Sequence, residues 1–383
     1  MTTSTLIPPA AARPFAEYAA LPAAETRART RAARARLGRR AVILGHHYQR
    51  ESIIEFADLR GDSLKLSQLA AAQTEAEFIV FCGVHFMAES ADVLRQPHQT
   101  VVLPDLKAGC SMADMARIDD VEEAWALLSA RHGDTIVPIT YMNSTAALKA
   151  FCGARGGIVC TSSNARAVLE WAWARQPRAL FFPDQHLGRN TAFAMGVPLE
   201  RMAEWDWRAE DLERANARGF DPATLLTLWH GFCSVHTKFT ARQIEEARAA
   251  DPAVRILVHP ECPFEVVQNA ALAGSTEFII EQVRRAPPGS HWAIGTEINL
   301  VHRLALEHPE QTIHSLQKNV CPCATMNRID PAHLLWALEN LAEGHVVNRI
   351  SVSAEVRRDA RLALDRMLAL AATGGADPRL ARD

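Results

Sequence analysis

The chain of 383 residues contains no apolar run approaching the roughly 18 to 20 residues that a membrane-spanning helix needs. It has no basic stripe and a formal net charge of −3, which argues against nucleic acid as a main partner. No two cysteines form a CxxC pair, so zinc-ribbon and ferredoxin-type spacings are excluded. Its 48% hydrophobic and 22% charged residues are instead typical of a soluble globular protein of two or three domains.

The N-terminal stretch is rich in Ala and Arg and lacks the continuous apolar core of a secretory signal. We therefore expect a cytoplasmic protein, with a tail that leads into a surface helix over residues 22–37. In that compartment the eight cysteines are not expected to form disulfides.

At three places along the chain, a short apolar run ends in residues that can do chemistry. The runs are 41–49, 135–143 and 254–262, and each is typical of a buried strand. Parallel α/β sheets place their ligand sites at the carboxyl ends of strands, so three such strands predict three related units that face one pocket. The residues at these ends are His46 and Tyr48, Tyr141 and Asn143, and His259 and Glu261.

Further apolar runs follow each of these strands, with helical periodicity between them. The repeat is one of layout rather than of sequence identity, and it predicts an α/β fold of three units. The second runs are 77–87, 157–163 and the segment around 274–280, and the third runs are 100–105, 179–184 and 291–297.

Three of the cysteines lie in loops, one in each third of the chain. Cys110, Cys233 and Cys321 have the distribution that a shared metal centre on a pseudo-threefold axis would need. Three unrelated loop cysteines are the alternative. Cys82 and Cys160 lie inside apolar runs and are expected to be buried core residues.

Ten short motifs, in order, resemble those of quinolinate synthases, the iron–sulfur enzymes of bacterial NAD biosynthesis. The resemblance spans residues 38–345. The motifs are HHYQ (46–49), GDSLKLS (61–67), GVHFMAESADVL (83–94), CSMAD (110–114), YMNSTAALKA (141–150), CTSSNA (160–165), PDQHLGRNTA (183–192), HPEC (259–262), GST (274–276) and GTEINLVHRL (295–304).

The resemblance implies three pseudo-threefold-related αβα sandwich domains with small parallel sheets and an active site at their junction. The expected division is an N-terminal tail and helix (1–37), domain 1 (38–118, completed by C-terminal helices in 330–383), domain 2 (119–205) and domain 3 (206–329). It further implies the condensation of iminoaspartate with dihydroxyacetone phosphate to quinolinate, with loss of two waters and inorganic phosphate. A functional link to an L-aspartate-oxidising enzyme is expected from this substrate.

The resemblance also implies a [4Fe–4S] cluster held by one cysteinate from each domain, with the fourth iron open to act as a Lewis acid. Cys110, Cys233 and Cys321 are the expected ligands. Cys321 is preferred as the third because a proline follows it, and Cys323, two residues further on, is the alternative.

The strand-end residues then take roles in catalysis. Glu261 is the expected general base, with His259 and His46 as binders of carboxylate or phosphate. Tyr48, Tyr141 and Asn143 supply hydrogen bonds that do not titrate near neutrality. The expected catalytic residues are Glu261, Tyr48, His259 and Tyr141.

Hydroxyl side chains beside expected helix starts complete the predicted substrate site. Hydroxyls and free backbone N–H groups at such positions bind carboxylate or phosphate, although N-capping alone is the alternative. These residues are Ser63, Ser162, Ser275 and Thr276.

Two other functions compete with this interpretation. One is a hydrolase with a single zinc or iron bound by His46, His259 and Glu261. The other is a non-catalytic iron–sulfur sensor, for which the sequence offers no evident effector module.

Overall fold

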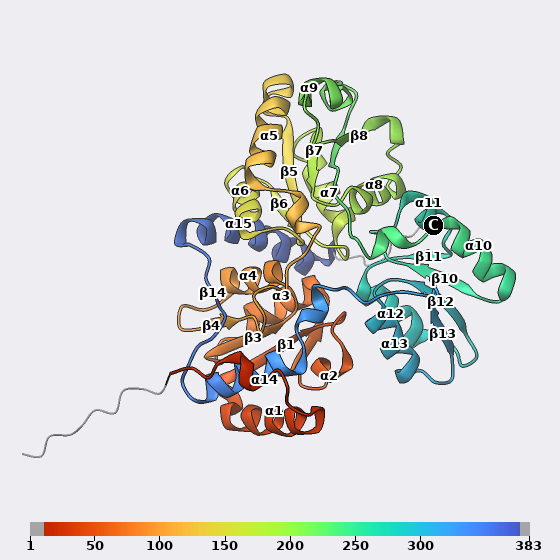
Figure 1. Cartoon of the computed structure of the whole chain (residues 1–383). Coiled ribbons are helices and arrows are strands. Elements are labelled where there is room, and N and C mark those ends of the chain that lie inside the picture. Colours follow the sequence, from red (N-terminus) through yellow and green to blue (C-terminus); the bar gives the residue numbers. More distant parts are fainter. Residues whose placement is uncertain (1–10, 376–383) are drawn as a thin grey trace, which may run out of the picture.

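The computed structural model describes residues 11–375 and contains three β-sheets flanked by helices, which confirms the α/β class. Figure 1 shows three lobes, one around each sheet, and we number them in chain order. Residues 1–10 of the expected N-terminal tail and residues 376–383 of the expected C-terminal helices lie outside the described residues.

The three sheets share one pattern of strand pairing. In each lobe the opening strand is paired in parallel on both sides, with the next strand at one side and a third strand at the other. A fourth parallel strand extends the sheet beyond the third. Parallel strands of one sheet all end at the same edge. In each of the three lobes, the polar end of the opening strand therefore lies at the carboxyl-end edge of its own sheet.

The strands have the following bounds. In the first lobe they are β2 (Leu59–Gly61), β1 (Ala41–His46), β3 (Phe78–Cys82), β4 (Thr100–Val102) and the antiparallel β14 (Arg349–Ile350). In the second they are β6 (Ile158–Cys160), β5 (Ile136–Tyr141), β7 (Arg178–Phe182), β9 (Leu226–Trp229) and β8 (Met202–Trp205). In the third they are β11 (Leu272–Ala273), β10 (Arg255–Val258), β12 (His291–Gly295) and β13 (Thr312–Ser315).

The layout of the first lobe corrects one expectation. The strand in the run 77–87 is the third strand of its sheet rather than the second, because residues 59–61 form the edge strand beside β1. The sequence had placed 59–61 in a helical stretch. Three residues between two helices are too few to show a strand periodicity, so only the pairing with β1 reveals this strand.

The second strand of the third lobe was also misplaced. It is the two-residue strand β11, and the expected strand around 274–280 is instead the beginning of a helix. Ser275 caps that helix, accepting a hydrogen bond from the backbone N–H of Phe278 at 3.4 Å. The cap ends the extended backbone and begins the helical one.

Helices cover the sheets and join the lobes (Figure 1). The first lobe has α1 (Ala23–Leu37), α2 (Glu51–Ile54), α3 (Ser63–Ala72), α4 (His85–Leu94) and α14 (Pro331–Ala342). The second has α5 (Ile118–His132), α6 (Ala146–Ala154), α7 (Ala165–Trp173), α8 (Gln185–Ala194) and α9 (Leu212–Ala215), with α15 (Ala354–Leu370) packed on α6. The third has α10 (Ala241–Ala250), α11 (Phe264–Asn269), α12 (Thr276–Arg285) and α13 (Ile298–Glu307).

Two features of this arrangement depart from the expected domain limits. Strand β9 pairs with β7 and β8, so the second sheet extends past residue 205. The C-terminal part of the chain divides between two lobes, because α14 packs on α1 of the first lobe while α15 packs on α6 and β6 of the second. Non-local pairing of this kind leaves no mark in local composition.

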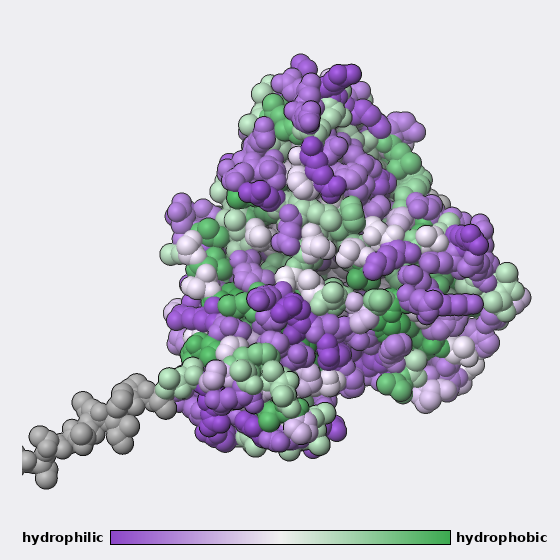
Figure 2. All heavy atoms as spheres, viewed as in Figure 1, coloured by the Kyte–Doolittle hydropathy of each residue, from purple (hydrophilic) through white to green (hydrophobic). Residues whose placement is uncertain are grey.

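The surface is polar over the tips of the lobes, whereas paler, less polar residues gather where the lobes meet (Figure 2). In residues 11–375 no helix combines the length and the apolar character needed to span a bilayer.

The contact between α6 and α15 generates a test of the packing. A Cβ atom at Gly153 would lie 1.8 Å from the carbonyl oxygen of Asp359. We expect Gly153→Ala to force these helices apart and to lower the free energy of unfolding by about 1–3 kcal/mol, measured by urea unfolding. Gly219→Ala is the matched control, because its Cβ would meet Trp205 at 3.5 Å and Leu128 at 3.7 Å, both ordinary contact distances. Equal stability of the two variants would contradict this packing.

Candidate active site

The carboxyl ends of β1, β5 and β10 open into one cavity at the junction of the lobes. The structure thus brings together strand ends as far apart in the sequence as His46 and Glu261, which are 215 positions apart. The cavity lining includes the six residues expected at these ends: His46, Tyr48, Tyr141, Asn143, His259 and Glu261.

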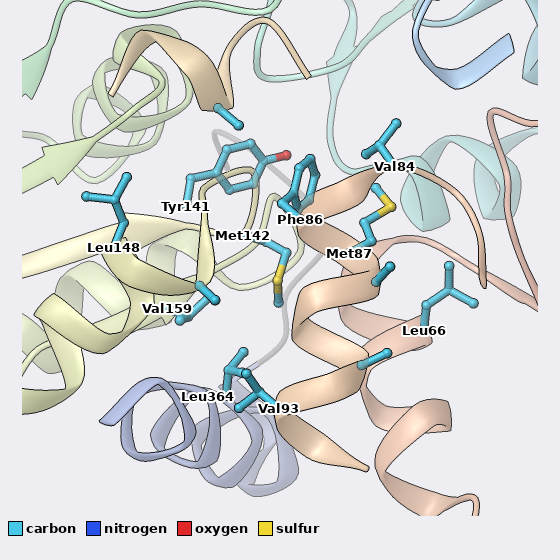
Figure 3. Close-up of a cluster of buried hydrophobic side chains, with 14 of the residues drawn as sticks. Leu66, Val84, Phe86, Met87, Val93, Tyr141, Met142, Leu148, Val159 and Leu364 are labelled. Carbon is cyan, nitrogen blue, oxygen red and sulfur yellow. The ribbon is translucent and has the colours of Figure 1, made fainter. Parts of the chain in front are cut away.

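One wall of the cavity is apolar. Val84, Phe86 and Met87, at the beginning of α4, line it, and Tyr141 reaches toward Phe86 from the end of β5 (Figure 3). Within residues 11–375, no Lys or Arg side chain lines the cavity. An anionic ligand would therefore depend on neutral donors and on helix N-termini.

The two strand-end histidines share one local geometry. The Nδ1 atom of His46 accepts a hydrogen bond from the backbone N–H of Tyr48 at 3.1 Å, and the Nδ1 of His259 accepts one from Glu261 at 3.3 Å. Because Nδ1 is the acceptor, the neutral ring carries its proton on Nε2. Burial lowers the pKa of both rings to about 3, so each is a neutral Nε2–H donor.

The two tyrosines are donors that stay protonated. Burial, followed by the charge of Glu261, raises the pKa of Tyr48 and of Tyr141 well above the usual value. The hydroxyl of Tyr48 lies 2.8 Å from Oγ1 of Thr296 and 3.0 Å from Oγ1 of Thr276. It is therefore held at the boundary between the first and third lobes.

Glu261 has a close partner that the sequence analysis did not assign. Nδ1 of His236 lies 2.6 Å from Oε2 of Glu261, and both side chains are buried. Burial acts to raise the pKa of Glu261, but His236, followed by His259 and the Tyr141 hydroxyl, outweighs burial and lowers the pKa to about 2. Glu261 is therefore a carboxylate at neutral pH, in close contact with the imidazole of His236.

The signal for His236 was present in the sequence but weak. His236 follows Cys233 by three residues in the loop after β9, and its ring stacks on that of His259 with centroids 4.5 Å apart. A histidine three residues from a candidate metal ligand is common in unrelated loops. Only the folded structure shows that this one faces Glu261.

The expected anion-binding hydroxyls do lie at helix starts. Ser63 is the first residue of α3, after the N-cap Asp62, and Ser162 lies just before the N-cap Asn164 of α7. Both line the cavity, as does Thr276. Ser275 is fully buried as the N-cap of α12 and is outside the lining, so of this pair Thr276 reaches the cavity.

Three cysteines line the cavity, and the third is not the one preferred from the sequence. Cys110, Cys233 and Cys323 are lining residues, whereas Cys321 is exposed and lies outside the lining. Proline 322 separates the two, and extended backbone turns alternate side chains to opposite sides. The cavity therefore contains Cys323, the alternative from the sequence, in place of the preferred Cys321.

Each of the three cysteine loops has a hydrogen bond that ties it to another part of the site. Oγ of Ser111, beside Cys110, lies 3.4 Å from Oγ of Ser234, beside Cys233. The backbone N–H of Cys323 donates to the buried carboxylate of Glu297 at 3.0 Å. The chain itself thus holds the three thiols around one space.

The thiols are suited to a metal that displaces their protons. Burial raises the pKa of Cys110 to about 12 and that of Cys233 well above its usual value. A buried thiol without a cation stays protonated and unreactive, whereas a bound iron converts it to a thiolate ligand. Three cysteine donors fit an iron–sulfur cluster better than they fit calcium or magnesium, which prefer oxygen ligands.

A second set of possible metal ligands overlaps the first. Among residues 11–375, Cys233, His236 and Glu261 are the one group of three whose ligand atoms all lie within 4.8 Å of one another. This set does not contain His46 or His259, so the triad expected for a hydrolase with a single metal does not form. Within the set of Cys233, His236 and Glu261, the last two already bind each other through the contact between Nδ1 and Oε2.

Three parallel α/β sheets around a buried cavity, lined by thiols, imidazoles and a carboxylate, define a multi-lobed α/β protein with an enzyme-like central site. The family model described as quinolinate synthetase A protein matches residues 29–369. The chain belongs to the quinolinate synthase family.

Individual relatives agree with this assignment. A quinolinate synthase of Geobacillus kaustophilus is 57% identical over 354 residues, covering 92% of this chain and 96% of the relative. One from Corynebacterium glutamicum is 54% identical over 360 residues, covering 94% and 91%. One from Bacillus cereus is 52% identical over 340 residues, covering 89% and 92%.

The buried histidines predict a specific loss of stability in acid. Their pKa is about 3 in the folded chain against 6.5 in the unfolded one, so the unfolded chain binds more protons between these values. The free energy of unfolding therefore falls as the pH is lowered through that window, by about 2 kcal/mol per histidine at pH 5. Between pH 8 and pH 5 the free energy of unfolding, measured with urea, should fall in both proteins. We expect the fall to be about 2 kcal/mol smaller in His46→Gln than in the unchanged chain, because the variant lacks one of these histidines. An identical pH dependence would contradict the neutral, buried state of His46.

Proposed function

We propose that the chain condenses iminoaspartate with dihydroxyacetone phosphate to form quinolinate, releasing two waters and inorganic phosphate, with a [4Fe–4S] cluster as cofactor. One observation carries the proposal. Three thiols from three distant loops share a single cavity with a carboxylate–imidazole pair and two protonated tyrosines. Membership of the quinolinate synthase family supports the same reaction.

Cys110, Cys233 and Cys323 would hold the cluster. Fe–S clusters take cysteine thiolates as ligands, and three cysteines leave one iron without a protein ligand. When bound, such a cluster supplies a Lewis acid that assists the departure of a hydroxyl group as water.

The side chains that bind the substrate anions are neutral. The Nε2–H groups of His46 and His259 donate to carboxylate or phosphate oxygens, and Asn143 adds an amide. The Oδ1 atom of Asn143 is buried without a hydrogen-bond partner in the described structure, so it is free to accept from a bound ligand. Ser63 and Ser162, at the starts of α3 and α7, line the same space, where a helix N-terminus favours negative charge.

Proton transfer is assigned to Glu261, paired with His236. A carboxylate with a pKa near 2 is by itself a weak base; Nδ1–H of His236, 2.6 Å away, holds it in place, and Glu261 accepts a proton from substrate and returns it to a departing oxygen. Tyr48 and Tyr141 remain protonated and stabilise developing negative charge on a substrate oxygen.

The proposed substrate also implies a partner reaction. Iminoaspartate is the two-electron oxidation product of L-aspartate, so an L-aspartate-oxidising enzyme must supply it. The direct assay therefore combines such an enzyme, L-aspartate, dihydroxyacetone phosphate and the anaerobically reconstituted protein, and measures quinolinate and phosphate. Absence of both products at full iron and sulfide content would refute the proposal.

The choice between the two neighbouring cysteines is directly testable. We expect Cys323→Ala to lose most of its iron and acid-labile sulfide, together with the brown absorbance, because one of three cluster ligands is gone. Cys321→Ala is the matched control and should keep a full cluster, since its side chain is exposed. The opposite pattern would restore Cys321 as the ligand.

The role of Glu261 is tested by Glu261→Gln. The amide fills the same volume but accepts no proton, so turnover should fall by roughly 10²–10⁴-fold, the range of a positioned acid or base. The cluster content should be unchanged, because Glu261 is not a proposed ligand. Near-normal turnover would remove Glu261 from the mechanism, and loss of the cluster would show that it holds the site together instead.

A further inference from the structure

One residue after each opening strand occupies an equivalent place in the cavity lining. Tyr48, Asn143 and Glu261 each lie two positions after another lining residue of the same strand end. In all three cases, a single buried side chain donates hydrogen bonds to the backbone carbonyls immediately before and immediately after that residue. These three donors, which we call the carbonyl clamps, are Arg303, Lys149 and Asn190.

The first clamp crosses between lobes. Nη2 of Arg303, on α13 of the third lobe, donates to the carbonyl of His47 at 2.6 Å, and Nη1 donates to the carbonyl of Gln49 at 3.4 Å. These two carbonyls flank Tyr48 in the first lobe. Arg303 is buried, with 6% of its surface exposed.

The second clamp lies within the second lobe. Nζ of Lys149, on α6, donates to the carbonyl of Met142 at 2.9 Å and also to that of Ser144, so its two acceptors flank Asn143. Lys149 is fully buried, and its ammonium lies 5.5 Å from the ring centroid of Phe86. Burial lowers its pKa to about 8.

The third clamp crosses from the second lobe to the third. Nδ2 of Asn190, on α8, donates to the carbonyls of Pro260 and of Cys262, both at 2.9 Å. These two carbonyls flank Glu261. Asn190 is also fully buried.

The repetition argues for a specific task. Removing an ammonium or guanidinium group from water is costly, and a neutral carbonyl recovers less of that cost than a carboxylate would. A donor that binds the carbonyls on both sides of one residue fixes the neighbouring peptide groups and hence the direction of the side chain between them. Three different residue types from three different helices do this at the same position of three strand ends.

We propose that Arg303, Lys149 and Asn190 are positioning residues that set the directions of Tyr48, Asn143 and Glu261 in the cavity. The inference rests on the proposed function, because it takes its roles for Asn143 and Glu261 from there. It predicts that each clamp acts through the residue that it brackets. A misplacement of about 1 Å in such a residue can cost on the order of 10²-fold in rate.

Asn190 offers the sharpest test, because its target is the proposed base. We expect Asn190→Ala to lower kcat by on the order of 10²-fold at nearly unchanged KM, with normal iron content. In the Glu261→Gln background the same change should have little further effect, since the side chain it positions no longer transfers a proton. Full, additive loss in that background would overturn the inference. Asn190→Ser keeps one donor, so its kcat should lie between those of Asn190→Ala and the unchanged chain. Equal kcat values for the Ser and Ala variants would contradict the inference.

Thr191→Val is the matched control on the same helix. Thr191 is as buried as Asn190, but its hydroxyl donates to the carbonyl of Leu187 within α8. We expect its kcat to stay within a few fold of the unchanged chain. A loss equal to that of Asn190→Ala would show that any polar change in α8 is sufficient and would refute positioning.

Lys149→Met tests a binding role with a readout that needs no turnover. The change keeps the length of the side chain and removes its donors, so quinolinate should bind about 10-fold more weakly in calorimetry, with KM raised and the folded circular dichroism retained. Unchanged quinolinate affinity would overturn the assignment for Lys149. If the unchanged protein made no quinolinate, the proposed function would fail but the positioning role would remain testable. Crystal structures of Lys149→Met and Asn190→Ala should then show displaced loops at 142–144 and 260–262, and undisplaced loops would overturn the inference.

Discussion

The buried negative charge of Glu261 is the constraint on which the junction depends. Its side chain is 3% exposed, and in the described structure its carboxylate lies near the imidazoles of His236 and His259 rather than near Lys or Arg. A carboxylate in such a place must be compensated locally or it would take up a proton. The contact with His236 keeps it charged, and its charge adds to the effect of burial in keeping Tyr48 and Tyr141 protonated. Burial and one ionised group together set the protonation of these neighbours.

The same junction explains why three small sheets form one molecule. The sheets have four or five short strands each, and the polar ends of their opening strands could not be buried by any one lobe alone. Contacts between lobes satisfy them: Tyr48 bonds to Thr276 and Thr296, and Asn190 bonds across to the loop of Glu261. The site and the interface between lobes are therefore the same structure. A change that loosens one is expected to disturb the other.

The use of neutral donors follows from this burial. With His46 and His259 uncharged near neutrality and no Lys or Arg in the lining of the described chain, anions meet dipoles and hydrogen bonds rather than fixed positive charge. Buried cations are nearby, but Arg303 and Lys149 are committed to backbone carbonyls. The charge of the cavity is therefore set by its carboxyl groups, which are those of Asp62, Glu261 and Glu297.

The sequence by itself determined the features that depend on local pattern. Apolar runs that end in polar residues located β1, β5 and β10 and their six cavity residues, and hydroxyls beside helix starts located Ser63, Ser162 and Thr276, because alternation and capping act over a few residues. Tertiary structure alone decided the rest. Strand β2 is too short to have a period, Cys321 and Cys323 differ only in which side of the loop faces the cavity, and His236 gains its role from a carboxylate 25 positions away. The carbonyl clamps depend likewise on long-range contacts, since a donor on one helix finds its carbonyls only after the lobes have met.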